Sequence, residues 1–240
     1  MLTNETIIKL AAKMQTSEQN VRREYFQHLF LSLFYKQDGA DKVFFKGGTA
    51  LRLIYNSPRF SEDLDFNSPL ADVHSIENAI VNTLVEVQKG GVETELDEAK
   101  KTSGGYLSTM RFIGMGRAVP IRIEISFRDR KKKGEAVFIA SDMFPDYTIV
   151  QLVSEQLIQG KVDALLDRKK PRDFYDFYFL MRRNLLPEKD KGDVLRQVFE
   201  ALKKTDINFD SELKEFLPKS HHMIVKDFKT TLKREIERFI

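Results

Sequence analysis

The chain has no cysteine among its 240 residues, which excludes disulfide bonds and metal sites built on thiolates. It also has no hydrophobic run of membrane-spanning length, because even the apolar stretch 26–35 is short and interrupted by polar residues. Residues 1–13 include an acidic side chain and never build the apolar segment of a cleavable signal. These absences predict a cytoplasmic protein without a membrane partner.

A large excess of charge of one sign is missing too, since the net charge of +3 is too small to indicate a nucleic-acid-binding protein by itself. The basic residues are nevertheless clustered in two segments, 128–133 and 168–172. Either cluster alone is typical of a solvated loop. Two such clusters indicate a polyanion partner only if they flank a site of phosphoryl-transfer chemistry.

Hydrophobic periodicity divides the chain into three regions. Residues 4–36 fit two helices, and between 41 and 146 short strand-like runs alternate with helical patterns. The remainder indicates helices only, the first with Ile149 and Val153 on one face. We therefore predict an α/β (α+β) fold with a mixed sheet. The expected domains are an N-terminal helical region (1–40), an α/β core (41–146) and a C-terminal helical domain (147–240).

Two short motifs in the α/β region suggest chemistry. Gly47-Gly48-Thr49 follows an expected strand and opens an expected helix, where main-chain N–H groups can bind phosphate. Asp63 and Asp65 stand at the start of the next strand, on which residues i and i+2 point to the same side about 7 Å apart. Two carboxylates on one face suit Mg²⁺, which also takes waters and substrate phosphates as ligands. Each motif alone is common, but together they predict chemistry on a nucleotide.

A third acid lies on a later strand. Residues 121–126 alternate, so that three isoleucines share one face and Arg122, Glu124 and Ser126 share the other. Glu124 could complete the metal site or deprotonate an attacking hydroxyl. An outward-facing acid on a half-exposed strand explains it equally well, and both interpretations stay open.

The helical region contributes three further candidates. Lys161, beside an otherwise apolar helix face, can reach a triphosphate as a mobile point charge, although a lone lysine is more often a surface residue. Asp173 and Asp176 lie one helical turn apart. Asp173 has a simple structural explanation, because an acid in the first turn of a helix favours the helix dipole. That explanation is weaker for Asp176, which lies deeper in the helix.

With these motifs the chain resembles the nucleotidyltransferase AbiEii family, toxins of type IV toxin–antitoxin systems related to the MenT toxins. The resemblance extends from about residue 44 to residue 180. The Gly-Gly-Ser/Thr turn followed by Asp-x-Asp is shared with the wider polymerase-β-like nucleotidyltransferases. A more specific signature, Lys-x-x-Ala-Leu-x-x-Arg followed by Lys-Pro-Arg-Asp-x-Tyr-Asp, occurs here at 161–168 and 170–176. Family members often carry Glu before this lysine, where this chain has Gly160.

The resemblance implies a polymerase-β-like nucleotidyltransferase core and a role for each matched position. The implied nucleotide-binding residues are Gly47, Gly48, Thr49 and Lys161. The implied Mg²⁺ ligands are Asp63 and Asp65. Asp173 or Asp176 would help complete the active site, and Glu124 matches the third acid of the wider superfamily.

The resulting prediction is an Mg²⁺-dependent enzyme that moves an NMP from an NTP to an acceptor hydroxyl. The resemblance suggests tRNA as the acceptor and a separately encoded antitoxin as a partner. Two basic clusters flanking such a site favour a polyanion, and the candidate RNA-binding residues are Arg130, Lys131, Lys132, Lys133, Lys169 and Lys170. The alternatives are a small-molecule or protein acceptor, or a catalytically idle module that binds nucleotide or RNA.

Overall fold

The computed structural model describes residues 1–69, 72–189 and 191–239. The chain divides into two compact units. Unit 1 comprises Met1–Asn56 and Phe60–Val153, and unit 2 comprises Ser57–Arg59 and Ser154–Ile240. No helix in the described ranges is long and apolar enough to cross a membrane.

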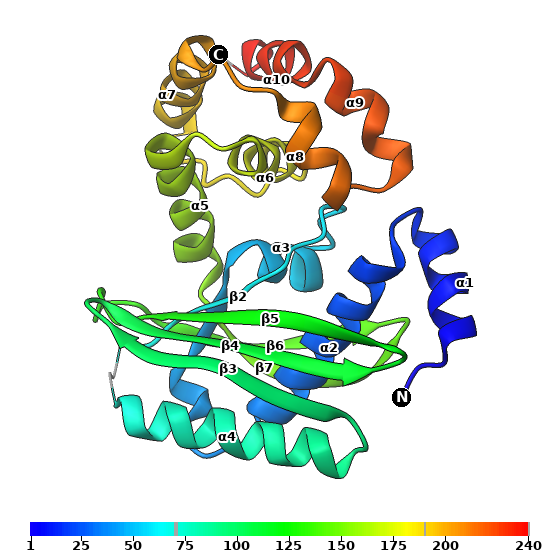
Figure 1. Ribbon diagram of the computed structural model, residues 1–240. Helices are drawn as coiled ribbons and strands as arrows, with labels where there is room; N and C mark the ends of the chain where they lie inside the picture. The colour runs from blue at the N-terminus through cyan, green and yellow to red at the C-terminus, as the bar shows by residue number, and fades with distance from the viewer. Residues whose placement is uncertain (70–71, 190, 240) are drawn as a thin grey trace. The chain divides into compact units, whose positions relative to one another are not determined.

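Unit 1 is built on a seven-stranded sheet with the order β3-β4-β5-β2-β1-β7-β6 (Figure 1). The strands are β1 (Phe44–Lys46), β2 (Leu64–Asn67), β3 (Glu93–Thr102), β4 (Gly105–Gly114), β5 (Arg117–Ser126), β6 (Gly134–Ser141) and β7 (Phe144–Leu152). The pairs β2–β5 and β1–β7 are parallel, and the other neighbouring pairs are antiparallel. The predicted α/β architecture with a mixed sheet is confirmed.

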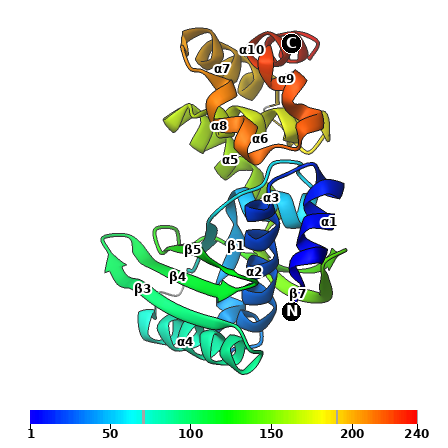
Figure 2. The same cartoon turned by 45° about the vertical axis from the view of Figure 1, so that its right-hand side comes forward.

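The helical segments of unit 1 are α1 (Asn4–Met14), α2 (Glu18–Phe34), η1 (Ala40–Lys42), α3 (Gly47–Tyr55) and α4 (Val73–Lys89). Helix α2 packs against one face of the sheet, where Phe26 stacks on Phe112 of β4 and Phe34 contacts Phe66 of β2, with ring centroids 5.2 and 5.8 Å apart. Helix α4 lies beside α2 and against β3, as both ribbon views show (Figures 1 and 2). Burial of these aromatic rings supplies much of the hydrophobic stabilisation of unit 1.

The alternation predicted for β5 is confirmed. Ile121, Ile123 and Ile125 are buried, whereas Arg122 and Glu124 belong to the opposite face. Phe66 pairs in register with Ile125, so the α2-covered face of β2 and β5 is apolar. The other face of the same strands therefore carries the charged residues.

The helical interpretation of residues 147–152 is wrong, because they belong to strand β7 and helix α5 begins only at Ser154. The i, i+4 spacing of Ile149 and Val153 suggested a helix. The segment Tyr147–Val150, however, is rich in aromatic and β-branched residues, which fit a pleated sheet. Here β7 pairs with β6 along its length and with β1 at Gln151, so tertiary pairing overrides the local helical pattern.

The helical segments of unit 2 are α5 (Ser154–Arg168), α6 (Pro171–Arg182), α7 (Lys191–Lys204), α8 (Phe209–Phe216), η2 (Lys219–His221), α9 (His222–Lys226) and α10 (Phe228–Glu237). Pro171 opens α6, as predicted, because its fixed φ suits the first helical position. The core of the unit is aromatic: Phe209 contacts both Phe174 and Phe228, with ring centroids 5.7 and 5.1 Å apart. Helix α6 is thereby fixed at the centre of unit 2.

Candidate active site

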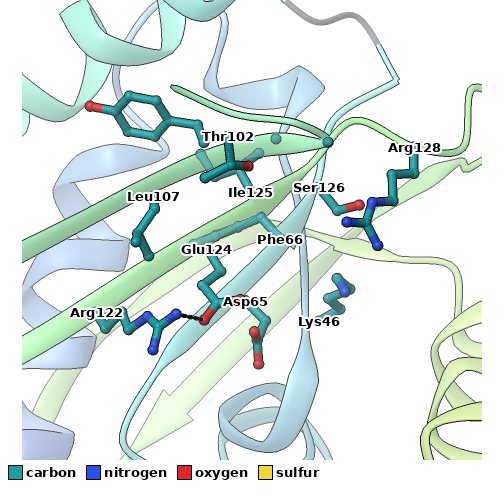
Figure 3. Close-up of a pocket in the computed structure, with 13 residues that line it drawn as sticks. Lys46, Asp65, Phe66, Thr102, Leu107, Arg122, Glu124, Ile125, Ser126 and Arg128 are labelled. Carbon is teal, nitrogen blue, oxygen red and sulfur yellow. Dashed lines mark ion pairs between the residues drawn. The ribbon is translucent and has the colours of Figure 1, made fainter. Parts of the chain in front are cut away.

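Three charged residues lie side by side on adjacent strands of unit 1. Asp65 on β2 is paired in register with Lys46 on β1 and with Glu124 on β5. Because adjacent strands are about 4.8 Å apart, paired residues project from the same face of the sheet as close neighbours. All three line one pocket of about 300 Å³, in which Figure 3 shows the Asp65 and Glu124 carboxylates next to each other. The register thus brings together two predicted site residues and adds a lysine.

Gly47 provides the space that the Asp65 carboxylate occupies. Its backbone has a φ of +87°, a region that residues with side chains rarely adopt. A Cβ atom at this position would lie 2.1 Å from Oδ2 of Asp65. The glycine turn and the Asp-x-Asp motif, which are separate in the sequence, are therefore in direct contact.

Thr49 ties the start of α3 to the segment that carries Asp63. Its buried hydroxyl donates to the main-chain oxygen of Asp63 at 2.5 Å. Asp63 directly precedes β2, and the N-cap residue Lys46 forms no side-chain capping bond to α3. The first turn of α3 consequently presents main-chain N–H groups of the kind that bind phosphate.

The Asp63 carboxylate lies in an unfavourable environment for a negative charge. Burial raises its pKa, and the charges of Asp65, Glu62 and Glu124 raise it further, to about 6, against the opposing effect of Arg122. A divalent cation would relieve this repulsion, and hard carboxylate oxygens are the ligands that Mg²⁺ prefers. Asp63 and Asp65 therefore fit such an ion.

In the described part of the chain, Glu124 is not part of a preformed metal-binding site. Its carboxylate forms an ion pair with Arg122, with a 2.6 Å contact. Across residues 1–69, 72–189 and 191–239, no three His, Asp or Glu side chains form a group that could hold a metal ion. Additional metal ligands would have to come from substrate phosphates and water, which is the usual situation for Mg²⁺.

Unit 2 contains a second charged cluster, centred on the buried carboxylate of Asp176 on α6. Lys161 on α5 donates to its Oδ2 at 2.8 Å. Arg59 donates through Nε to Oδ1 at 2.7 Å and through Nη2 to Oδ2 at 2.9 Å. The fold thus brings the predicted residues Lys161 and Asp176 together.

Asp176 is held in its ionised form. Burial by itself would raise the pKa of this carboxyl, but the charges and hydrogen bonds of Arg59 and Lys161 outweigh that effect and lower the pKa to about 2. A lysine ammonium has three N–H donors. Lys161 uses one of them in its bond to Asp176 and can donate the others to a ligand. A fixed carboxylate can therefore orient Lys161 toward an anionic ligand.

Asp173 has a different environment at the start of α6. Its Oδ1 accepts from Arg168 at 2.6 Å, and its Oδ2 accepts from the main-chain N–H of Lys170 at 3.3 Å. One oxygen thereby binds the main-chain N–H of the N-cap residue of α6 and the other binds a side chain from the end of α5, which agrees with a structural role at the start of the helix. Of the two predicted aspartates, Asp176 is the one in contact with Lys161.

The two basic clusters lie in different units. The first occupies the connection between β5 and β6, where Lys132 pairs with Asp129 at 3.3 Å. The second lies at the junction of α5 and α6, where Lys169 and Lys170 are exposed. Both clusters present cationic side chains to solvent.

Two residues of these clusters were not predicted as site residues from the sequence. Lys46 directly precedes the glycine pair at the end of a strand, and this position could have indicated that it belongs to the site. Arg59 lies four residues before Asp63 in a stretch without periodicity, and no pattern in the sequence marks it as the partner of a residue 117 positions away.

Comparison with known proteins places the chain in a family and shows which folds it resembles. The family model described as "Nucleotidyl transferase AbiEii toxin, Type IV TA system" matches residues 29–238. Among solved structures, MenT4, a nucleotidyltransferase toxin from Mycobacterium tuberculosis, is 17% identical, with a TM-score of 0.72 over 99% of this chain and 90% of MenT4. JHP933 from Helicobacter pylori is 21% identical, with a TM-score of 0.57 over 93% of this chain and 95% of JHP933. At these identities the structural likeness shows a shared fold. No curated protein matches the sequence.

Proposed function

Because the chain belongs to the AbiEii family of nucleotidyltransferase toxins of type IV toxin–antitoxin systems, we propose that it transfers an NMP from an NTP to a hydroxyl of tRNA in the presence of Mg²⁺. The observation that carries this proposal is the row of Lys46, Asp65 and Glu124 across three strands, beside the glycine turn. The family also implies an antitoxin partner.

Each group has a part in binding. Asp63 and Asp65 would hold Mg²⁺, which when bound stabilises the charge of the reacting phosphates. The N–H groups at the start of α3, at Gly48 and Thr49, would bind nucleotide phosphates. Lys161, oriented by Asp176, would bind the triphosphate as a point charge.

In the proposed step the acceptor hydroxyl oxygen forms a bond to the α-phosphorus of the NTP. The bond from that phosphorus to the oxygen bridging to the β-phosphorus breaks, and its electron pair leaves with pyrophosphate. The proton of the hydroxyl passes to the Glu124 carboxylate, which lines the pocket beside Asp65. Lys161 offsets the charge that builds up on the departing pyrophosphate.

A nucleic-acid acceptor is supported by the exposed basic residues of the β5–β6 connection and the α5–α6 junction. Phosphate contacts of this kind make binding strongly salt-dependent. Neutralising Lys131, Lys132 and Lys133 together should weaken RNA modification and leave NTP binding unchanged. Undiminished RNA modification by this variant would remove the loop from the proposal.

The test of the function is incubation of the purified protein with Mg²⁺, each α-³²P-labelled NTP in turn, and total tRNA. Asp65→Ala is the inactive control, and Asp142→Ala is a matched control because this side chain is 76% exposed and lies outside the pocket. Label on RNA that disappears only with Asp65→Ala supports the proposal. Label on protein or on a small molecule would replace tRNA by another acceptor, and no label on any acceptor would favour a binding module.

A further inference from the structure

Arg128 forms part of the wall of the pocket that contains Asp65. We propose that Arg128, together with Lys46, binds a phosphate of the acceptor nucleic acid, namely the phosphate of the nucleotide whose hydroxyl is modified. This inference rests on the proposed function, because it places the acceptor in the same pocket.

Arg128 is held in place by the turn between β3 and β4. The N–H of the preceding residue, Phe127, donates to the main-chain oxygen of Gly104 at 2.9 Å. The Arg128 side chain lies directly over this glycine, because a Cβ atom on Gly104 would be 2.3 Å from Nε of the arginine. Arg128 is therefore a positioned residue and not simply one more cation of the basic loop.

The charge of Arg128 is not neutralised by a neighbouring acid. In the part of the chain that the structure describes, no carboxylate forms an ion pair with its guanidinium. Arg122, on the other side of the pocket, is instead paired with Glu124 at 2.6 Å. A planar guanidinium of this kind can bind two oxygens of one phosphate.

Two of the cations that line the pocket, Lys46 and Arg128, lie away from the Arg122–Glu124 ion pair. Figure 3 shows Lys46 and Arg128 on one side, with the carboxylates of Asp65 and Glu124 beside them. The pocket volume of about 300 Å³ is at the lower end of small-ligand sites, which suits a single nucleotide.

This charge arrangement matches the chemistry of a nucleotide in a chain. Its sugar carries both a hydroxyl and a phosphate, so a hydroxyl beside Glu124 places a phosphate one sugar away, toward Arg128. A protein hydroxyl has no phosphate at that position. The pocket thus favours the end of a polynucleotide as the acceptor.

The same phosphate chemistry could be supplied by the NTP, so the two substrates must be varied separately. We would measure steady-state kinetics of Arg128→Gln with NTP and tRNA each titrated in turn. Arg117→Gln is the matched control, because Arg117 is an exposed arginine at the other end of β5 and does not line the pocket. Thermal unfolding confirms that both variants are folded.

For Arg128→Gln we expect the KM for tRNA to rise about tenfold, as for loss of a charge-assisted contact, with kcat and the KM for NTP nearly unchanged. The salt dependence of log K for RNA should become shallower by about 0.7, which corresponds to one phosphate contact on a single strand. Arg128→Lys should restore part of the loss, because it keeps the charge but not the planar fork.

A change in the RNA tests the same contact from the other side. With an acceptor RNA that carries a neutral methylphosphonate at its last linkage, the KM of the wild-type protein for RNA should rise about as much as it does for Arg128→Gln with unmodified RNA. Combining the two changes should then cause little additional loss, because both remove one interaction. Fully additive losses would overturn the inference.

The remaining outcomes separate the inference from the proposed function. A rise in the KM for NTP instead of tRNA would assign the phosphate to the triphosphate and overturn the acceptor site. If Arg128→Gln and Arg117→Gln have equal kinetic constants, the inference about Arg128 is overturned. The proposed function would still stand in that case, provided that labelling of RNA depends on Asp65. Absence of RNA labelling by the wild-type protein would overturn both.

Discussion

The guanidinium of Arg59 holds the carboxylate of Asp176 through two hydrogen bonds, one to each oxygen, at 2.7 and 2.9 Å. Both side chains are almost fully buried, with 6% and 2% of their surface exposed. Lys161 adds a third bond to the same carboxylate. The two cations have replaced the water that an ionised carboxylate would otherwise require.

Replacement of Arg59 by alanine should destabilise the protein by about 3–5 kcal/mol, because it leaves the buried Asp176 with Lys161 as its remaining ionic partner. Arg172→Ala is the matched control, since Arg172 faces Glu212 across 3.8 Å with both side chains partly exposed. Such a pair contributes about 1 kcal/mol or less. Urea unfolding of both variants checks the prediction, and equal losses would show that the Arg59 contact does not stabilise the fold.

The two aspartates of α6 should differ in their effects on activity. Asp176→Asn should lower kcat by about a hundredfold or more, because Lys161 loses the charged group that orients it. Asp173→Asn should destabilise α6 by about 1 kcal/mol but leave kcat nearly unchanged at a temperature at which it is folded. Activity assays paired with circular dichroism distinguish the two, and a comparable loss of kcat in Asp173→Asn would contradict this division.

Gly47→Ala should abolish most activity, because the new methyl group would occupy the position of the Asp65 carboxylate. Displacement of a reacting group by about 1 Å can cost a hundredfold in rate. Gly160→Ala provides the matched control, since no atom lies within 4 Å of the position its Cβ would take. That change in the middle of α5 should stabilise the protein by about 0.5–1 kcal/mol and preserve activity. Equal activity of the two variants would contradict the prediction that a methyl group at position 47 displaces the Asp65 carboxylate.

Acidification should destabilise the fold through His28. The ring is buried, and its Nδ1 forms a hydrogen bond with the Tyr147 hydroxyl at 2.8 Å. Burial, together with the positive charge of Arg52, lowers the pKa of His28 from 6.5 to about 4. Between these two values the unfolded state binds more protons than the folded state, so stability falls as the pH is lowered through that window. The contribution of His28 to the free energy of unfolding should fall by about 2 kcal/mol between pH 7 and pH 5. The raised pKa of Asp63 acts in the opposite direction over the same range, so the prediction concerns the difference between variants.

His28→Gln should remove this part of the pH dependence, whereas His74→Gln should retain it, because His74 is exposed at the start of α4. Urea unfolding of the two variants and the wild-type protein at pH 7 and pH 5 makes the comparison. An unaltered pH dependence in His28→Gln would assign the effect to other groups.

The local patterns of the sequence predicted much of unit 1. Alternation along β5 identified the faces of Ile123 and Glu124, and the glycine turn marked the start of α3. Both features depend on residues that are neighbours in the chain. The strand at 147–152 was missed because its conformation depends on pairing with β6 and β1, which no short window of sequence contains.

The sequence indicated that charged residues form sites, but it did not indicate all the residues that make up each site. Lys161 and Asp176 are marked by a motif within one helical pair, whereas Arg59 reaches them from a distant segment. Likewise, Arg128 appeared as one of several basic residues in the sequence, and only the folded structure shows that it lies over Gly104 and lines the pocket with Asp65. Long-range pairing therefore decides which of many charged residues share a site.

Because unit 2 includes Ser57–Arg59, it is assembled from two distant parts of the gene. On the ribosome, Arg59 is synthesised 117 residues before the aspartate that it binds. A message cut short before the codon for Asp176 yields a product without that carboxylate, and a fragment starting at Ser154 lacks the arginine that neutralises it. During translation, the complete charged cluster can therefore form only after residue 176 has been added to the chain.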